Sequence, residues 1–434
     1  MSRIHTFIVG CLSLFATGVA SGQNCVDGQP IRPTYTSESG YWGGIGVALA
    51  GSDLFLGTDT LGHVAVLRPT ATSGYSQVQL ITGVYPISHL VAESGTLAVG
   101  MEWSDNGGVK LYRKQANGTY ALGATLSGSV AGEAFGHRVA LSEDALTLAI
   151  GAPNAGVAPF AMSGKVYVYT KSVTTGLWTL LTTLTPAAGL AANAEFGTDV
   201  SVSGNKIAVA DNSTYGYVFV RNGNVYTQQQ RLTNSTPTAS TVRIRVSSNW
   251  VWFQHNSRYD AFEQPTGATT WTLKQTLIFN LYDLYDSSWN FESGRFVIAD
   301  EHDGQHSRVR VYTQSAAGAN WANSFTGVSA AIDWSDNPQA AIDGDLIAAT
   351  APRMDYGSVG DFGGAFIFDC VFNDCNGNGT RDECDIAGST SSDSNGNGIP
   401  DECESLCRAD VNEDGVVDGV DMSFILSGWG NCPP

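Results

Sequence analysis

The residues best suited to chemistry lie in an acidic stretch at the end of the chain. Three twelve-residue segments begin at Asp374, Asp393 and Asp410, with oxygen-bearing side chains at positions 1, 3, 5, 9 and 12 and Gly at position 6. Ca²⁺ takes six to eight oxygen ligands, and the glycine permits the sharp turn that wraps them around the ion. Mg²⁺ prefers fewer protein ligands and more water. The spacing therefore predicts three calcium sites of the kind found in EF-hand loops.

The predicted ligands follow one scheme in all three segments. Position 7 supplies a backbone carbonyl oxygen, and the shorter Asp385 and Asp421 at position 12 are expected to bind through one oxygen. Three matches within 48 residues favour calcium over a merely solvated acidic end. The predicted ligands are Asp374, Asn376, Asn378, Thr380, Asp382, Asp385, Asp393, Asn395, Asn397, Ile399, Asp401, Glu404, Asp410, Asn412, Asp414, Val416, Asp418 and Asp421.

The negative charge of the chain is concentrated in the same stretch. The chain has 41 acidic and 22 basic residues, a formal net charge of −19. From Asp369 onward, 14 acidic residues face only Arg381 and Arg408. Phosphate binding needs a basic surface, so we expect no nucleic-acid partner.

The tail resembles two kinds of known calcium module. Residues 371–406 contain two segments that repeat every 19 residues, with Cys375 and Cys384 at loop positions 2 and 11 of the first. They resemble thrombospondin type 3 calcium repeats. Residues 407–434 hold the third segment followed by an apolar stretch, 420–429, that predicts a short helix capped by Gly428. This loop and helix resemble one half of a dockerin module, which implies an anchoring role and a cohesin-like partner.

The elements before the tail are short strands. Between residues 40 and 368, runs of Val, Ile, Tyr and Thr alternate with Gly, Asn, Asp and Ser, with almost no helical period. A pattern of about four strands recurs roughly every 45 residues. Its copies lie at 135–184 and 196–220, and around 47–67, 90–112, 242–262, 291–312 and 340–368. Seven copies predict an all-β, seven-bladed β-propeller over residues 23–370. A two-sheet sandwich does not use so many strands.

One copy carries a recognisable phrase. Residues 135–169 contain Phe-Gly-x-x-Val-Ala, then Ile-Gly-Ala-Pro, then Gly-x-Val-Tyr-Val-Tyr. This phrase resembles the FG-GAP repeat of integrin α-chain-like propellers. Some blades of that family carry an Asp-rich calcium loop, but the matching loops at 154–163 and 212–216 lack its spacing. We therefore expect no calcium site in the propeller itself.

The seventh copy lacks a fourth strand. The segment 31–36 has strand character and no blade of its own, so we expect it or its neighbours to complete the last blade. That closure would bring Cys25 and Cys370 near each other. The remaining cysteines after residue 22 all lie in the tail, a distribution that favours disulfides in an exported protein. The expected pairs are Cys25–Cys370, Cys375–Cys384 and Cys407–Cys432, which leaves Cys403 as the odd thiol.

The first 22 residues have the layout of a secretory signal peptide. Arg3 and His5 precede an apolar run at 7–15, and small residues follow up to Gly22. The run is too short to cross about 30 Å of hydrocarbon, and no later segment has about 20 apolar residues. We therefore expect residues 1–22 to be removed from a soluble, secreted protein that is extracellular or lies at a cell surface.

No catalytic motif is evident in the sequence. His302 and His306 lie four residues apart, but in a predicted loop rather than a helix. Scattered carboxylates could meet across the central channel as a glycosidase pair, and several tryptophans could stack on sugars. The carboxylates are Asp283, Asp286, Asp300, Glu301, Asp333, Asp336 and Asp355, and the tryptophans are Trp103, Trp289, Trp321 and Trp334. Loop placement and blade packing are the ordinary roles of such residues.

These observations favour a secreted, calcium-binding, non-catalytic propeller for extracellular adhesion, binding or scaffolding. Its partner would be an extracellular protein or a glycan, and its tail would serve as an anchoring module. The alternative is a secreted polysaccharide-acting enzyme with a catalytic propeller and the same anchor. A channel lined by Val, Ala and Gly would favour binding, whereas two close carboxylates over an aromatic floor would favour the enzyme.

Overall fold

The fold is known from a computed structural model in which the chain divides into two compact units. One unit is Cys25–Asp369, and the other combines Met1–Asn24 with Cys370–Pro434. The structure describes residues 29–31, 46–58, 62–70, 75–102, 106–158, 160–187, 191–212, 215–234, 242–255, 258–279, 288–292, 294–301, 307–314, 319–328, 339–344, 346–351, 364–369, 386, 391–392 and 401–403.

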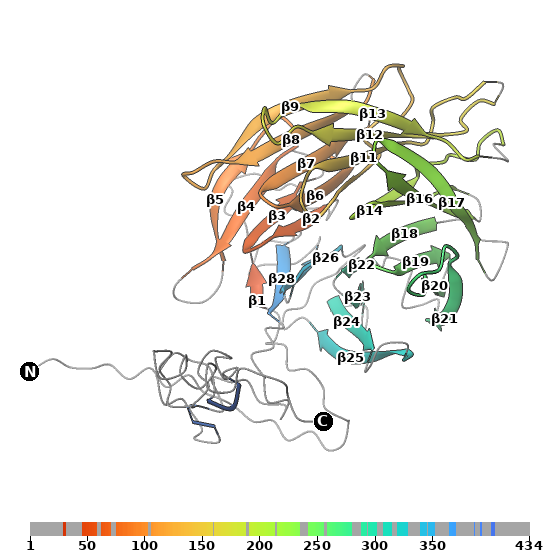
Figure 1. The fold of residues 1–434 in the computed structure, drawn as a ribbon. Coiled ribbons are helices and arrows are strands. Elements are labelled where there is room, and N and C mark those ends of the chain that lie inside the picture. Colours follow the sequence, from red (N-terminus) through yellow and green to blue (C-terminus); the bar gives the residue numbers. More distant parts are fainter. Residues whose placement is uncertain are drawn as a thin grey trace, which may run out of the picture. The chain divides into compact units, whose positions relative to one another are not determined.

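Seven four-stranded antiparallel sheets make up the first unit, as the sequence predicted (Figure 1). Blades 1 to 3 are β2 (Val47–Ala50), β3 (Asp53–Gly57), β4 (Val64–Pro69), β5 (Tyr75–Ile81); β6 (His89–Glu93), β7 (Thr96–Met101), β8 (Gly108–Lys114), β9 (Tyr120–Ser127); and β10 (Arg138–Leu141), β11 (Thr147–Ala152), β12 (Lys165–Lys171), β13 (Trp178–Leu184). Blades 4 and 5 are β14 (Asp199–Ser203), β15 (Lys206–Ala210), β16 (Tyr215–Asn222), β17 (Val225–Thr233); and β18 (Val242–Ser247), β19 (Trp250–His255), β20 (Arg258–Glu263), β21 (Thr272–Ile278). Blades 6 and 7 are β22 (Ser288–Glu292), β23 (Arg295–Glu301), β24 (Ser307–Gln314), β25 (Trp321–Val328); and β26 (Ala340–Asp343), β27 (Leu346–Ala351), β28 (Gly364–Asp369), β1 (Gln29–Ile31).

The ring closes through the N-terminal strand, which confirms the predicted closure. β1 pairs antiparallel with β28, with Gln29 opposite Ile367 and Ile31 opposite Ala365 (Figure 1). The strand begins two residues earlier than residue 31, and residues 32–36 lie outside the described part of the chain. One hydrophobic cluster contains Ile31, residues of β26 to β28, and residues of the first blade. The two ends of the propeller are therefore joined by both strand pairing and apolar packing.

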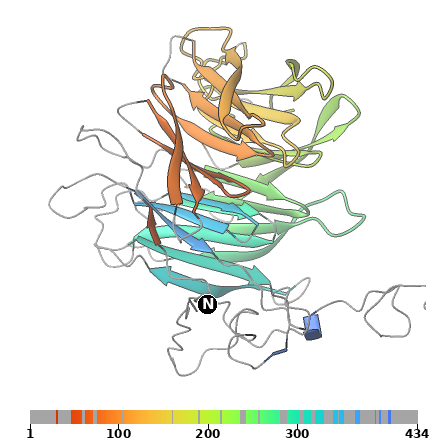
Figure 2. The ribbon, with the colours of Figure 1, turned by 90° about the vertical axis from the view of Figure 1, so that its left-hand side faces the viewer.

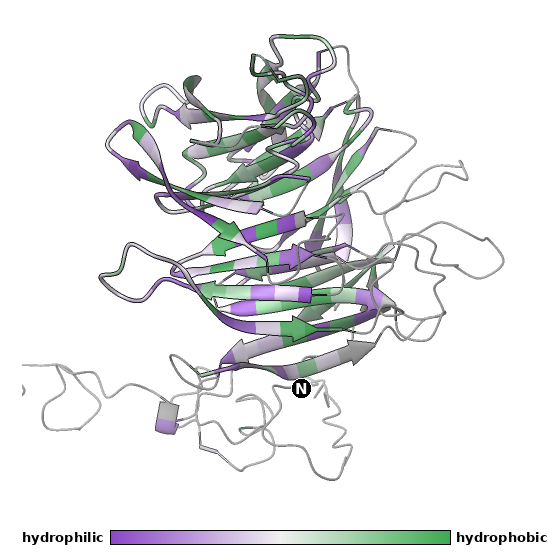
Figure 3. Cartoon of the chain, turned by 90° about the vertical axis from the view of Figure 1, so that its right-hand side faces the viewer, coloured by the Kyte–Doolittle hydropathy of each residue, from purple (hydrophilic) through white to green (hydrophobic). Residues whose placement is uncertain are grey.

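Apolar side chains fill the space between the blades. Figure 3 shows hydrophobic residues recurring along the strands. The second strand of each blade is buried along nearly its whole length, as in β7 and β11. Neighbouring blades share clusters; Trp252 of β19, for example, stacks on Phe296 of β23 with ring centroids 4.1 Å apart. Burial of this kind is the main favourable term in folding. The turned view shows the blades succeeding one another around the propeller (Figure 2).

The Phe-Gly phrases join neighbouring blades. Phe135 forms a parallel bridge with Gly107, and Phe196 forms the same bridge with Gly164. A Cβ atom on Gly107 or Gly164 would lie 2.2 or 2.1 Å from the carbonyl oxygen of the partner Phe. Both glycines also have positive φ angles, +77° and +84°. Only glycine suits these positions, because the next blade passes directly against the backbone.

Two further observations bear on the chain as a whole. No helix in the described ranges is long and apolar enough to cross a membrane. In the tail, the structure describes a short 3₁₀ turn, Asp401–Cys403, whose first N–H donates to the carbonyl oxygen of Ser392 at 2.7 Å.

Candidate ligand site in the central channel

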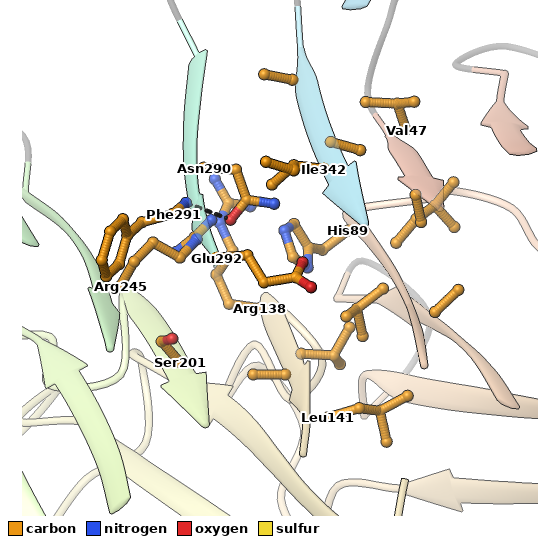
Figure 4. A pocket seen from close by; sticks show the side chains of 18 of the residues that line it. Val47, His89, Arg138, Leu141, Ser201, Arg245, Asn290, Phe291, Glu292 and Ile342 are labelled. Carbon is orange, nitrogen blue, oxygen red and sulfur yellow. Dashed lines mark hydrogen bonds between the residues drawn. The ribbon is translucent and has the colours of Figure 1, made fainter. Parts of the chain in front are cut away.

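The inner strands of the seven blades surround one cavity. They are the first strands of the blades (β2, β6, β10, β14, β18, β22 and β26), and each contacts the inner strand of the next blade, including β26 with β2. The cavity has a volume of about 430 Å³ and is lined by residues of all seven strands (Figure 4). Ligand pockets commonly measure about 300–1,000 Å³, so this one can hold a small molecule.

Side chains of one blade satisfy the inner strand of the next. The backbone N–H groups of Ile244 and Val246 in β18 donate to Asp199 Oδ2 at 2.9 Å and to Ser201 Oγ at 3.0 Å. An inner strand has no further strand beside it, so these N–H groups would otherwise lack a protein partner. Asp199 and Ser201 alternate along β14, as residues on one face of a strand do. This arrangement fixes β18 and its arginines beside β14.

Basic side chains gather where the inner strands begin. We call this end, marked by His89 of β6, Arg138 of β10 and Arg243 of β18, the strand-start mouth. Asp199 lies between two of its arginines, with its Oδ2 atom 2.6 Å from Nη1 of Arg245 and its Oδ1 atom 3.7 Å from Nε of Arg138. The Arg245 guanidinium also lies 5.6 Å from the ring centroid of Trp289. Asp199 and Trp289 therefore hold Arg245 in one position.

Arg243 and His89 lack such partners. Within the described part of the chain, neither side chain forms a hydrogen bond or an ion pair, and the Nδ1 atom of His89 is buried without a partner. Burial, and then the charge of Arg138, lowers the pKa of Arg243 to about 10, so the guanidinium remains charged at neutral pH. Burial and the nearby arginines hold the pKa of His89 well below its usual range, so the imidazole is neutral. This mouth therefore has uncompensated positive charge.

Carboxyl groups gather where the inner strands end. We call this end, marked by Glu93 of β6, Glu292 of β22, Asp343 of β26 and Glu143 after β10, the strand-end mouth. Burial, and then the charges of Glu292, Asp343 and Glu143, raises the pKa of Glu93 to about 9. Burial and Asp343 raise the pKa of Glu292 to about 7. Charge is thus separated along the channel, with guanidinium groups at one mouth and carboxyl groups at the other. The side chains of His89, Arg245 and Glu292 point toward its middle (Figure 4).

The predicted calcium ligands are not brought together in the described part of the chain. Asp401 lies in the 3₁₀ turn, and the other predicted ligands lie outside the described residues. The paired cysteines of the prediction also lie outside them, as do His302 and His306. Among the residues that the structure describes, no group of three or more His, Cys, Asp or Glu side chains could hold a metal ion. The calcium sites therefore stay a prediction.

Some channel candidates from the sequence have other roles. Asp300 is fully buried in β23 and forms ion pairs with Arg308, at 2.8 Å, and with Arg310, so it is a blade residue rather than a channel carboxylate. Trp289 and Trp321 are 1% and 3% exposed and pack between blades. Of the other five aspartates, and of Trp103 and Trp334, the structure describes none, and it does not describe the side chain of Glu301.

The charged channel residues were missed by sequence reasoning. Arg243 and Arg245 interrupt the apolar strand 242–247, and Glu93 and Glu292 end inner strands. Charged residues inside an otherwise apolar run were the available signal, because buried charges need a reason. Their gathering in one channel depends on the ring, which brings together residues as distant in sequence as Glu93 and Glu292.

Comparison with known proteins gives a likeness in fold. No protein-family model matches the chain, and no curated protein matches its sequence. The WD40 domain of Toxoplasma gondii coronin matches with a TM-score of 0.52 at 11% identity, over 80% of this chain and 86% of that one. The β-propeller domain of Cps50 (Swd1) from Myceliophteria thermophila matches with a TM-score of 0.50 at 12% identity, over 78% and 99%. A periplasmic gluconolactonase from Pseudomonas aeruginosa, PpgL, gives 0.49 at 14% identity, over 69% and 90%.

Likeness at such low identity shows the fold alone. The chain is a seven-bladed β-propeller of four-stranded blades, with structural neighbours among WD40 propellers.

Proposed function

We propose that the chain is an exported, calcium-binding, non-catalytic propeller that binds an extracellular protein or glycan and is anchored by its tail. The observation that carries the binding role is the separation of charge along the central channel. Arg138, Arg243 and Arg245 lie at one mouth, and Glu93 and Glu292 lie toward the other. A cavity with a few convergent polar groups is the usual form of a binding site.

The tail supports the extracellular part of the proposal. Its three loop patterns place carbonyl and carboxylate oxygens where calcium needs them, and extracellular calcium modules bind in the range of about 10⁻⁴–10⁻³ M. The signal-like N-terminus and the cysteine-rich tail agree with an oxidising compartment. The likeness to FG-GAP propellers, thrombospondin type 3 repeats and a half dockerin points the same way.

A capture experiment tests this function. Full-length protein is immobilised and incubated with extracellular polysaccharides and with secreted proteins of the producing organism, with calcium or with chelator. We expect one class of material to be retained, and the anchoring partner of the tail to be released by chelator. If the folded, calcium-loaded protein retains none of these materials, the proposal is contradicted.

A second function has one specific observation in its favour. Glu93 and Glu292 face one channel, and burial raises the pKa of the former to about 9 and of the latter to about 7. A protonated acid and an ionisable carboxylate are the pair that glycoside hydrolysis uses. Phe291 and Trp289 belong to the same inner strand, β22, although their buried side chains pack between blades. The alternative is therefore a secreted polysaccharide-acting enzyme.

The two functions are separated by turnover. Wild-type protein and the variants E93Q and E292Q are incubated with a panel of polysaccharides, and the release of reducing ends is measured. The binding role predicts no release by any of the three proteins. Release by the wild type that falls at least a hundredfold in both variants would establish the enzyme instead, since acid–base catalysis contributes about 10²–10⁴ in rate.

A further inference from the structure

At the strand-start mouth, Arg245 is fixed by hydrogen bonds, whereas its neighbour Arg243 forms none within the described residues. Asp199 and the carbonyl oxygen of Ile244, at 2.6 and 2.7 Å, both accept hydrogen bonds from Nη1 of Arg245. Arg243 lies two residues earlier on β18, so both side chains leave the same face of the strand about 7 Å apart. Oδ2 of Asp199 accepts hydrogen bonds from Arg245 and from the N–H of Ile244, and Oδ1 lies 3.7 Å from Nε of Arg138 without accepting a hydrogen bond. Within the described residues Arg243 forms no ion pair with this carboxylate.

Arg138 adds a third guanidinium without adding a counter-charge. Its Nη1 atom donates to the carbonyl oxygens of Ser88 and His137, at 3.4 and 3.2 Å, and its pKa is lowered by burial despite the nearby Asp199. The other carboxylate near it, Glu102, is paired with His137. Three guanidinium groups, of Arg138, Arg243 and Arg245, therefore lie near one carboxylate, that of Asp199. Such charge is costly away from water unless an anion compensates it.

We propose that this mouth binds the oxyanion of a monosaccharide-sized ligand, a carboxylate or a sulfate, with Arg243 as its principal contact and Arg138 and His89 beside it. A guanidinium group presents paired N–H donors that can form a bidentate hydrogen-bonded contact with a carboxylate or a sulfate. His89 is neutral, so one ring nitrogen can donate and the other can accept a hydrogen bond. Its buried, unpartnered Nδ1 atom marks a place for a ligand atom.

The cavity favours a sugar-sized ligand over a polypeptide. The inner strands of all seven blades enclose this cavity of about 430 Å³. A space of this size suits a terminal uronic acid or sulfated sugar rather than a folded protein surface. Ser288 and Asn290 of β22 also line the channel and are neutral groups that can hydrogen-bond to hydroxyls. Acidic glycan ends are thus the chemistry that this cavity fits. The inference rests on the proposed binding role and narrows it to one ligand class.

Isothermal titration with defined probes tests the inference. Full-length protein, at constant calcium and low salt, is titrated with glucuronate, sulfate, glucose and a short glutamate-containing peptide. We expect one site for glucuronate and sulfate, no measurable heat with glucose, and weakening as salt is raised because the contact is ionic. Tighter binding of the peptide than of glucuronate, or equal binding of glucose, would overturn the assignment of an acidic sugar.

Variants assign the binding to the mouth. R243M keeps the approximate length of the side chain and removes its charge, and within the described ranges Arg243 makes no hydrogen bond that the substitution would break. We expect affinity for glucuronate to fall about tenfold or more, the loss of one charge-assisted hydrogen bond. R113M changes an exposed arginine of β8 and should leave the affinity unchanged.

Equal weakening by R243M and R113M, or no binding by the wild type, would overturn the oxyanion site. Thermal melting of both variants checks that they are folded. If the wild type fails to bind these probes but still captures extracellular material, the proposed function stands and only the ligand class is wrong. If both experiments give nothing, both proposals fail.

Discussion

The side-chain amide of Gln230 exchanges two hydrogen bonds with the backbone of Trp271 in the next blade. Gln230 Nε2 donates to the carbonyl oxygen of Trp271 at 3.0 Å, and the Trp271 N–H donates to Gln230 Oε1 at 2.7 Å. The same exchange joins Gln79 to Tyr120 and Gln275 to Trp321. A glutamine in an outermost strand thus satisfies the backbone beside an aromatic residue where the next outermost strand begins. These pairs join neighbouring blades at their outermost strands.

Removing one of these glutamines should destabilise the propeller. Q230A deletes both hydrogen bonds and leaves the backbone of the largely buried Trp271 without them, which should cost about 1–3 kcal/mol. Q115A is the control, because its exposed Nε2 atom makes only one bond, to the carbonyl oxygen of Arg113 at 2.9 Å. Urea unfolding should place the midpoint of Q230A below that of Q115A. Equal midpoints would show that the exchange contributes nothing.

The closing strand should carry a large share of stability despite its length. Ile31 is 2% exposed and packs with residues of blades 7 and 1, so I31A should lower the unfolding free energy by about 2–4 kcal/mol. Ile278 is 61% exposed, and I278A makes the same chemical change at the surface. Thermal unfolding of the two variants compares them directly. Similar melting temperatures would mean that the ring does not depend on β1.

Calcium should bind to the tail in a defined ratio. Full-length protein freed of metal should take up three calcium ions, one for each loop pattern. Alanine at position 1 of all three loops, D374A with D393A and D410A, should abolish uptake because each loop loses a carboxylate ligand. E383A changes an acidic residue at position 10, outside the ligand pattern, and should keep all three ions. Calorimetric titration measures the ratio; no uptake below the millimolar range would reject the calcium prediction.

Stability should depend on the proton held by Glu93. Because folding raises the pKa of Glu93 to about 9 from 4.5, the folded state favours the protonated form. This contribution is fully present below about pH 4.5 and is lost as pH rises through about pH 9. The free energy of unfolding should change by less than ~1.4 kcal/mol per pH unit from this group, because Glu93 is only partly buried.

The variant E93Q isolates this effect. Glutamine is neutral at every pH, so E93Q should match the wild type at acidic pH and melt at a higher temperature near pH 9. The opposite contribution of His89, whose lowered pKa favours folding as pH rises, is present in both proteins and cancels. Melting curves at constant calcium over this pH range give the difference. A difference that stays constant with pH would show that Glu93 is ionised in the folded protein.

The architecture could be read from local patterns. Strand alternation, turn residues and the recurring phrase at 135–169 predict seven blades, and the orphan strand before the first copy predicts the closure. These features are repeated, short-range and independent of exact register. The channel could not be read in the same way. Arg243 looks like any arginine in a strand, and Asp300 looked like a channel carboxylate although Arg308 and Arg310 hold it inside a blade.

The sequence by itself determined the repeat, the number of blades, the acidic tail and its calcium-loop spacing, because each depends on residues close together in the chain. Only the tertiary structure decided which charges share the channel. Closing the ring places Arg138, Asp199 and Arg245 from three successive blades within ion-pairing distance, and among the residues that the structure describes it gives Arg243 no ion pair. Whether a charge is compensated depends on neighbours that are distant in sequence, so the excess charge that points to a ligand appears only after folding.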